Sequence, residues 1–205
     1  MIVQDIINAA KYGELSSTAL KDNTEAVLTF MNLGLLELYK RFPLNTEEAT
    51  YPIGATTAVY ALPPNFMYPL VVYGENKDGD IDVEAKLPIN EEGEDPSVFF
   101  PNHRQVQIPS DLEGSRISVI YVSKPVSYTI DDLEIEVNLP ETLIEALLHY
   151  IGYKAHLGIK SDGQSENTAH YIRFDASCKK ARELGVAYSL DSYKMPDRLK
   201  DRGFA

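Results

Sequence analysis

The sequence predicts an α+β protein: a small helical bundle made from the N- and C-terminal segments, with an antiparallel β-rich domain inserted between them. Apolar residues recur at helical spacing near both ends of the chain, whereas between residues 46 and 138 this period is absent and short β-type runs alternate with turn residues. The end segments carry apolar faces too broad to bury alone, so they are expected to pack together. The predicted parts are a discontinuous helical bundle (1–45 and 139–190), an inserted acidic β domain (46–138) and an extended C-terminal tail (191–205).

Two helices are predicted before the β-rich segment. The first covers residues 2–12 and ends at Gly13. The second begins after Asp22 or Asn23, either of which can cap it, and ends at Pro43. Its apolar residues cover more than one stripe, so we expect it to be packed on more than one side.

The middle segment is predicted to hold seven short strands. The run Arg116 to Val122 is apolar on both faces and is therefore expected at the centre of a sheet. The sequence Asn76-Lys77-Asp78-Gly79 indicates a turn between two strands. The predicted strands are residues 47–53, 57–62, 69–74, 81–86, 97–100, 104–108 and 116–123.

Two further helices are predicted after the β-rich segment, at residues 140–158 and 166–188. Pro140 suits the first turn of the earlier one, and Gly158 suits its end. The only cysteine, Cys178, cannot form an internal disulfide and is expected to be a small core residue of the later helix. The tail from residue 191 lacks periodicity and is mildly basic.

The net charge of −12 is concentrated in the middle of the chain. Residues 44–138 contain 17 acidic and 5 basic residues, whereas residues 139–205 contain 9 acidic and 10 basic ones. An acidic surface repels phosphate, so specific nucleic-acid binding is not expected. No apolar run is long enough to span a membrane, and we expect no membrane partner.

The motifs of the common enzyme classes are missing from the sequence. It has no phosphate-binding glycine loop and no Gly-x-Ser-x-Gly elbow. Residues 76–82 resemble a calcium loop but lack its glycine and glutamate. His149 and His156 are two helical turns apart, about 10 Å, which is too far to share one zinc ion, so surface or packing roles are expected. We therefore predict no catalytic, cofactor-binding or metal-binding residues, no cofactor and no enzymatic activity.

The order of four segments resembles the head–tail adaptor (connector ring) family of tailed bacteriophages, especially the podovirus-type adaptors below the portal. Each segment is defined only by apolar spacing and proline positions, so the resemblance depends on their order. They are the helix from Ala26 to Tyr39; Tyr60-Ala61-Leu62-Pro63-Pro64-Asn65-Phe66 with the strand Leu70 to Tyr73; Val106-Gln107-Ile108-Pro109 with Ile117 to Tyr121 and Lys124-Pro125; and Leu139-Pro140-Glu141 with the helices that follow.

This resemblance implies a structural virion protein that forms a ring, usually of twelve copies, and joins the portal to the tail or to a second ring protein. Genomic DNA would pass through without specific binding, and assembly would take place in the host cytoplasm. The family has no catalytic residues. The alternatives are another virion ring, tail-tube or terminator subunit, a β-barrel that binds a small ligand, and a hydrolytic enzyme that uses the acidic loops and a metal.

In similar adaptors, C-terminal segments often reach into the portal. The tail of this chain has too little apolar content to fold alone, but it could become ordered on a partner. The candidate portal-contact residues are Tyr193, Lys194, Arg198, Lys200, Arg202 and Phe204.

Deletion of residues 191–205 is therefore expected to weaken portal binding, because the candidate contacts are lost while the predicted helical bundle and β domain are retained. Co-sedimentation with portal, compared between the full chain and the truncated chain, measures this. Equal co-sedimentation of the two would contradict the prediction.

Overall fold

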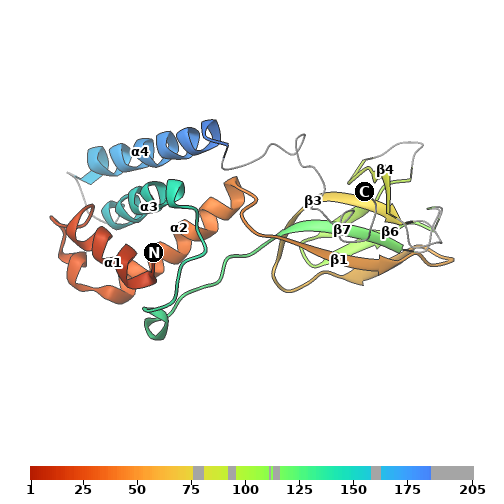
Figure 1. Ribbon diagram of the computed structural model, residues 1–205, viewed down its shortest axis with the longest axis horizontal. Coiled ribbons are helices and arrows are strands. Elements are labelled where there is room, and N and C mark those ends of the chain that lie inside the picture. Colours follow the sequence, from red (N-terminus) through yellow and green to blue (C-terminus); the bar gives the residue numbers. More distant parts are fainter. Residues whose placement is uncertain (76–80, 92–95, 111, 113–115, 158–162, 186–205) are drawn as a thin grey trace, which may run out of the picture. The chain divides into compact units, whose positions relative to one another are not determined.

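The computed structural model describes residues 1–75, 81–91, 96–110, 112, 116–157 and 163–185, and it divides into two compact units (Figure 1). The helical unit comprises Met1–Gly34 and Tyr128–Ala205, and the β unit comprises Leu35–Ser127. The helices are α1 (Val3–Tyr12), η1 (Ala19–Asp22), α2 (Thr24–Arg41), η2 (Ile130–Asp132), η3 (Glu141–Leu143), α3 (Ile144–His156) and α4 (Gly163–Glu183), where η marks a 3₁₀-helix. The strands are β1 (Thr46–Pro52), β2 (Ala58–Ala61), β3 (Phe66–Glu75), β4 (Ile81–Leu87), β5 (Phe99–Asn102), β6 (Gln105–Ile108) and β7 (Arg116–Ser123).

The helical unit is built around one apolar core to which both ends of the chain contribute. In Figure 1, α4 runs alongside α3. Between these two helices, the rings of Tyr150 and Phe174 meet edge to face with centroids 5.1 Å apart, a favourable aromatic geometry. The fully or almost fully buried residues of this core include Val3, Ile6, Ile7, Ala10, Leu15, Val27, Met31, Leu143, Leu147, Ile151, Phe174 and Cys178.

The first turn of α1 is satisfied by the chain that returns from the β unit. The backbone N–H groups of Val3 and Gln4 donate to the carbonyl oxygens of Ile135 and Leu133, both at 2.9 Å. The first N–H groups of a helix have no hydrogen-bond acceptor within the helix, so these distant carbonyls act as its N-terminal cap. The backbone N–H of Val137 also donates to the carbonyl of Met1 at 3.0 Å.

Asn32 on α2 makes a second connection to the same returning segment. Its Nδ2 donates to the carbonyl of Tyr128 at 2.8 Å, and its Oδ1 accepts from the backbone N–H of Tyr128 at 2.9 Å. One side chain thus satisfies both backbone polar groups of a buried tyrosine 96 positions later in the chain.

Gly34 allows α2 and α3 to pack closely within the helical unit. A Cβ at this position would lie 2.6 Å from Cδ1 of Leu147 and 3.1 Å from Cδ1 of Tyr150. Both neighbours are buried in the core, so a larger residue at Gly34 would displace the side chains of Leu147 and Tyr150.

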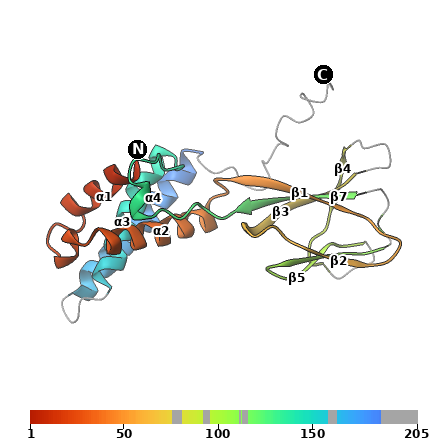
Figure 2. The ribbon, with the colours of Figure 1, turned by 90° about the horizontal axis from the view of Figure 1, so that it is seen from below.

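The β unit contains two antiparallel sheets, which Figure 2 shows as two layers. The four-stranded sheet has the order β1-β7-β3-β4, and the three-stranded sheet has the order β2-β6-β5. In the register of the larger sheet, Ala49 and Val72 both pair with Val119, which places β7 between two neighbours. Side chains from both sheets share one core, which includes Tyr51, Phe66, Val72, Val106, Ile108, Ile117, Val119 and Tyr121.

The structure confirms the predicted α+β class, the four helices and the central place of β7. Asn23 caps α2, because its Oδ1 accepts from the backbone N–H of Ala26 at 3.0 Å. The fourth helix ends earlier than predicted, at Glu183, where Gly185 adopts a positive φ of 75° that favours glycine. Residues 128–138 group with the helices. The predicted domain bounds, 1–45 with 139–190 for the bundle and 46–138 for the β domain, stay a prediction.

Asn32→Ala is expected to lower the free energy of unfolding by about 2–4 kcal/mol, because it leaves two partly buried backbone groups of Tyr128 unpaired, at about 1–2 kcal/mol each. Denaturant melts of the full chain measure this. Asn8→Ala is the matched control, since Asn8 is exposed and accepts one side-chain hydrogen bond from Gln4; a change within about 0.5 kcal/mol is expected there. Equal effects of the two substitutions would contradict the prediction.

Candidate functional site

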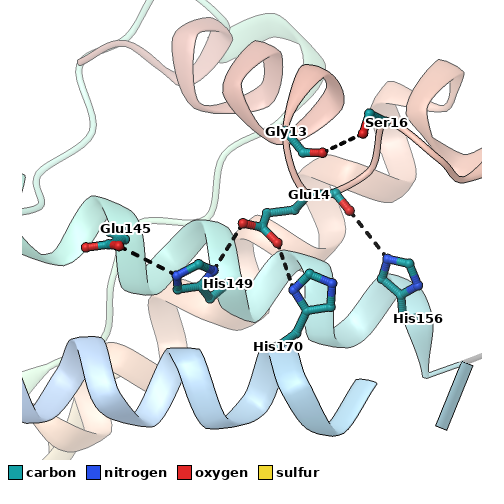
Figure 3. A network of polar contacts seen from close by, with 7 residues as sticks. All are labelled: Gly13, Glu14, Ser16, Glu145, His149, His156 and His170. Atoms are coloured by element: carbon teal, nitrogen blue, oxygen red, sulfur yellow. Dashed lines mark hydrogen bonds and ion pairs between the residues drawn. The ribbon is translucent and has the colours of Figure 1, made fainter. Parts of the chain in front are cut away.

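Three histidines and one glutamate form a polar cluster inside the helical unit (Figure 3). Glu14 follows Gly13, the residue at which α1 ends. His149 lies on α3, His156 is the last residue of that helix, and His170 lies on α4. The cluster therefore joins three segments that are far apart in sequence.

The Glu14 carboxylate lies between two imidazole rings. Its Oε1 is 3.1 Å from Nδ1 of His149, and its Oε2 is 2.7 Å from Nδ1 of His170. The backbone carbonyl of Glu14 is 3.4 Å from Nε2 of His156, whose ring stacks on that of His170 with centroids 4.8 Å apart. One ligand atom from each of Glu14, His149 and His170 lies within 4.8 Å of the others, so the three could hold one metal ion.

Gly152 makes room for the cluster on α3. A Cβ at this position would lie 2.8 Å from Nδ1 of His170 and 3.2 Å from Cβ of Glu14. These contacts are closer than real Cβ atoms normally make, so a side chain at this position would displace the ring or the carboxylate. The glycine thus lets the ring of His170 lie directly against the backbone of α3.

The pKa of the His170 ring is lowered from its ordinary value. Burial lowers its pKa, and the nearby Glu14 carboxylate opposes this effect. Positive charge on His156, Arg173 or His149 would lower the pKa of His170 further. The side chain of His170 is only 11% exposed, which agrees with burial as the main cause. A neutral imidazole retains a lone pair on one ring nitrogen.

An open pocket of about 360 Å³ lies beside this cluster in the helical unit. It gives solvent a route to part of the cluster. Its lining residues are Gly13, Glu14, Ser16, Ser17, His156, Ala169, His170 and Arg173.

A second polar network, in the β unit, has a structural role. Both carboxylate oxygens of Glu47 accept from Nδ2 of Asn65 at 2.9 Å, and the hydroxyl of Tyr121 donates to Oε2 at 3.0 Å. The donors, Asn65 first and then Ser123, lower the pKa of Glu47, whereas burial and Glu47 raise the pKa of Tyr121 to about 12. These bonds connect β1 to β7 and to the loop before β3, which stabilises the sheet.

The sequence analysis compared His149 with His156, whereas the structure brings His149 together with His170 and Glu14. His149 and His156 were expected at the surface or in packing roles, and the structure buries His156 and leaves the side chain of His149 only 13% exposed. Glu14 carried no signal, because it stands in a loop between two helices. Only the fold brings His170 to His149.

Some of the other positions considered in the sequence analysis lie among the residues that the structure describes, and the rest lie outside them. Asp132, in the acidic middle segment, accepts hydrogen bonds from the side chain and the backbone N–H of Thr129, both at 2.7 Å. These bonds lower its pKa, so it caps a turn. The centre of the calcium-like sequence, residues 76–80, and the tail residues Tyr193, Lys194, Arg198, Lys200, Arg202 and Phe204 lie outside the described residues.

Comparison with known protein families identifies the chain. A family model described as SU10 adaptor protein matches residues 1–198. The chain belongs to the SU10 adaptor protein family. A search of the curated proteins gave no match.

Membership of this family gives the adaptor its broad role. The family is one of phage head–tail adaptors, so the chain is a structural component of the virion. The family is a structural one. Among the described residues, no helix is both long and apolar enough to cross a bilayer.

Gly152→Val is expected to lower the free energy of unfolding by about 1–3 kcal/mol through overpacking against His170. The test combines Gly152→Val with His170→Ala in one double variant. His170→Ala removes the ring against which the new valine side chain would clash. His170→Ala should therefore cost less in the Gly152→Val background than in the wild type, as measured by denaturant melts. Additive costs would contradict the close contact between the two residues.

Proposed function

We propose that the chain assembles into a ring, of twelve copies by analogy with similar adaptors, that joins the portal to the tail or to a second ring protein. The observation that carries this proposal is the family match, which covers nearly the whole chain. The match ends at residue 198, so it includes Tyr193, Lys194 and Arg198 of the tail but not Lys200, Arg202 and Phe204.

Exposed apolar side chains on the helical unit support a role in assembly. Tyr171 and Ile172 are neighbours on α4 and are 42% and 61% exposed, and Tyr12 at the end of α1 is 85% exposed. Large exposed apolar groups are costly in water when they gather, and contacts between subunits can bury them. The helices of the proposed ring would therefore supply contacts between copies.

The charge of the middle segment supports a role as a conduit. Residues 44–138 carry 17 acidic and 5 basic residues, so their surface repels the phosphates of DNA. We place part of this segment at the channel or facing the tail, where DNA would pass without being held. A channel lined by Lys and Arg in a ring reconstruction would be incompatible with this placement.

The alternative that the β unit is a ligand-binding barrel has less support. The two sheets pack around a shared apolar core in which rings such as Phe66 and Tyr121, 5.1 Å apart, contact one another. These side chains occupy the interior in which an apolar ligand would have to bind. The remaining rivals, a tail-tube subunit or a terminator, are also virion ring proteins and differ in their partner.

The proposal predicts a ring of twelve chains. Its mass is twelve times that of one chain when the ring forms alone, and twelve chain masses plus the mass of the portal when the ring forms on the portal. Mass measurement of the isolated protein and of its mixture with portal tests this. A chain ending at residue 190 is the matched comparison, since it retains the proposed ring body and lacks the proposed portal contacts. A full-length chain that stays monomeric alone and does not bind portal would contradict the proposed function.

A further inference from the structure

The two Nδ1 atoms that face Glu14 lack hydrogen bonds. Both Nδ1 of His149 and Nδ1 of His170 are buried, and neither has a hydrogen-bond partner within the described part of the chain. The nearest carboxylate oxygens of Glu14 lie 3.1 and 2.7 Å from these nitrogens, at ion-pair distance. Buried polar atoms in native proteins are almost always satisfied, so these two nitrogens require an explanation.

A shared cation would satisfy all three groups at once. A zinc-class ion lies about 2.0–2.2 Å from imidazole nitrogen and carboxylate oxygen, so ligands in tetrahedral positions are about 3.4 Å apart. The ligand atoms of Glu14, His149 and His170 are all within 4.8 Å of one another, and each is on a side chain that can rotate. Rotation about these side-chain bonds would have to bring the ligand atoms to about 3.4 Å from one another.

The surroundings of His149 fit the role of a ligand. When its Nδ1 binds an ion, its Nε2 carries the proton, and Oε1 of Glu145 is 3.7 Å from that atom. Metal-binding histidines usually direct their other ring N–H at a carboxylate, which fixes the tautomer and makes the ring a better donor. The Glu145 side chain is 64% exposed and is free to move closer.

The Arg173 side chain near the cluster opposes a cation only weakly. Arg173 lines the adjacent pocket and is itself exposed, so solvent and salt screen its charge. The same pocket opens beside His170 and Glu14, which gives an ion a path to the cluster.

We propose that Glu14, His149 and His170 form a binding site for one zinc-class divalent ion, which links the end of α1 to α3 and α4. Three protein ligands leave one coordination position for water. Two imidazoles and one carboxylate favour zinc and similar transition metals over magnesium, which prefers oxygen ligands. The ion would cross-link the helical unit in the manner of a disulfide, in a chain whose one cysteine is buried in α4.

The test uses the full chain, stripped with a chelator and then titrated with zinc chloride or magnesium chloride. Calorimetry is expected to show one zinc per chain and no magnesium binding, and zinc should raise the thermal midpoint of unfolding. Glu14→Gln and His149→Gln should each weaken zinc binding by about 100-fold or more and abolish the thermal shift. Glu145→Gln should weaken zinc binding by about 10-fold, because it removes only the carboxylate that faces the other ring nitrogen of His149.

His103→Gln is the matched control, since His103 is an exposed histidine of the β unit, and its zinc affinity should equal that of the wild type. Circular dichroism of each variant without metal checks that the helices remain folded. Failure of the wild type to bind zinc at micromolar concentration would overturn the proposal. Equal zinc binding by folded Glu14→Gln, His149→Gln and wild-type chains would do so as well.

Discussion

The helical unit can be completed only after the chain has passed through the β unit and returned. The first N–H groups of α1 need acceptors, and the carbonyls of Leu133 and Ile135 supply them. Asn32 on α2 likewise pairs with the backbone of Tyr128. The entropy of closing so long a loop rises only slowly with length, so a β unit that is already folded shortens the effective loop and favours closure. The stability of the helices is therefore linked to the presence of the inserted sheets through chain connectivity.

Much of the fold could be predicted from local patterns. Apolar spacing identified four helices, and the two-sided apolar run of β7 identified the central strand, because burial on both faces leaves a direct trace in sequence. The end of α4 was placed too late because Tyr188 fitted the period, although Gly185 offered a stop signal. The attachment of residues 128–137 to α1 and α2 produces no apolar pattern in the sequence, because it depends on backbone groups and a single asparagine.

The histidine cluster shows why side-chain convergence is harder to predict than secondary structure. Spacing within one helix predicts that His149 and His156 are too far apart to share one ion, but it contains no information about a neighbouring helix. His170 reaches the cluster because α4 lies against α3, and it reaches it closely because position 152 has no side chain. A glycine inside a predicted helix, beside histidines on two helices, was the one available signal. It becomes informative only when the pairing of the helices is known.

The uneven charge of the chain makes contacts between copies less favourable for some segments than for others. In the proposed ring, each copy would add a middle segment with 17 acidic and 5 basic residues, and neighbouring acidic surfaces repel one another within the screening length of about 8 Å in physiological salt. Residues 139–205, with 9 acidic and 10 basic residues, carry no such penalty. Contacts between copies are therefore least opposed along α3, α4 and the residues that follow. The acidic segment meets least repulsion where it faces solvent or an open channel, which is also where a weak affinity for DNA would be useful.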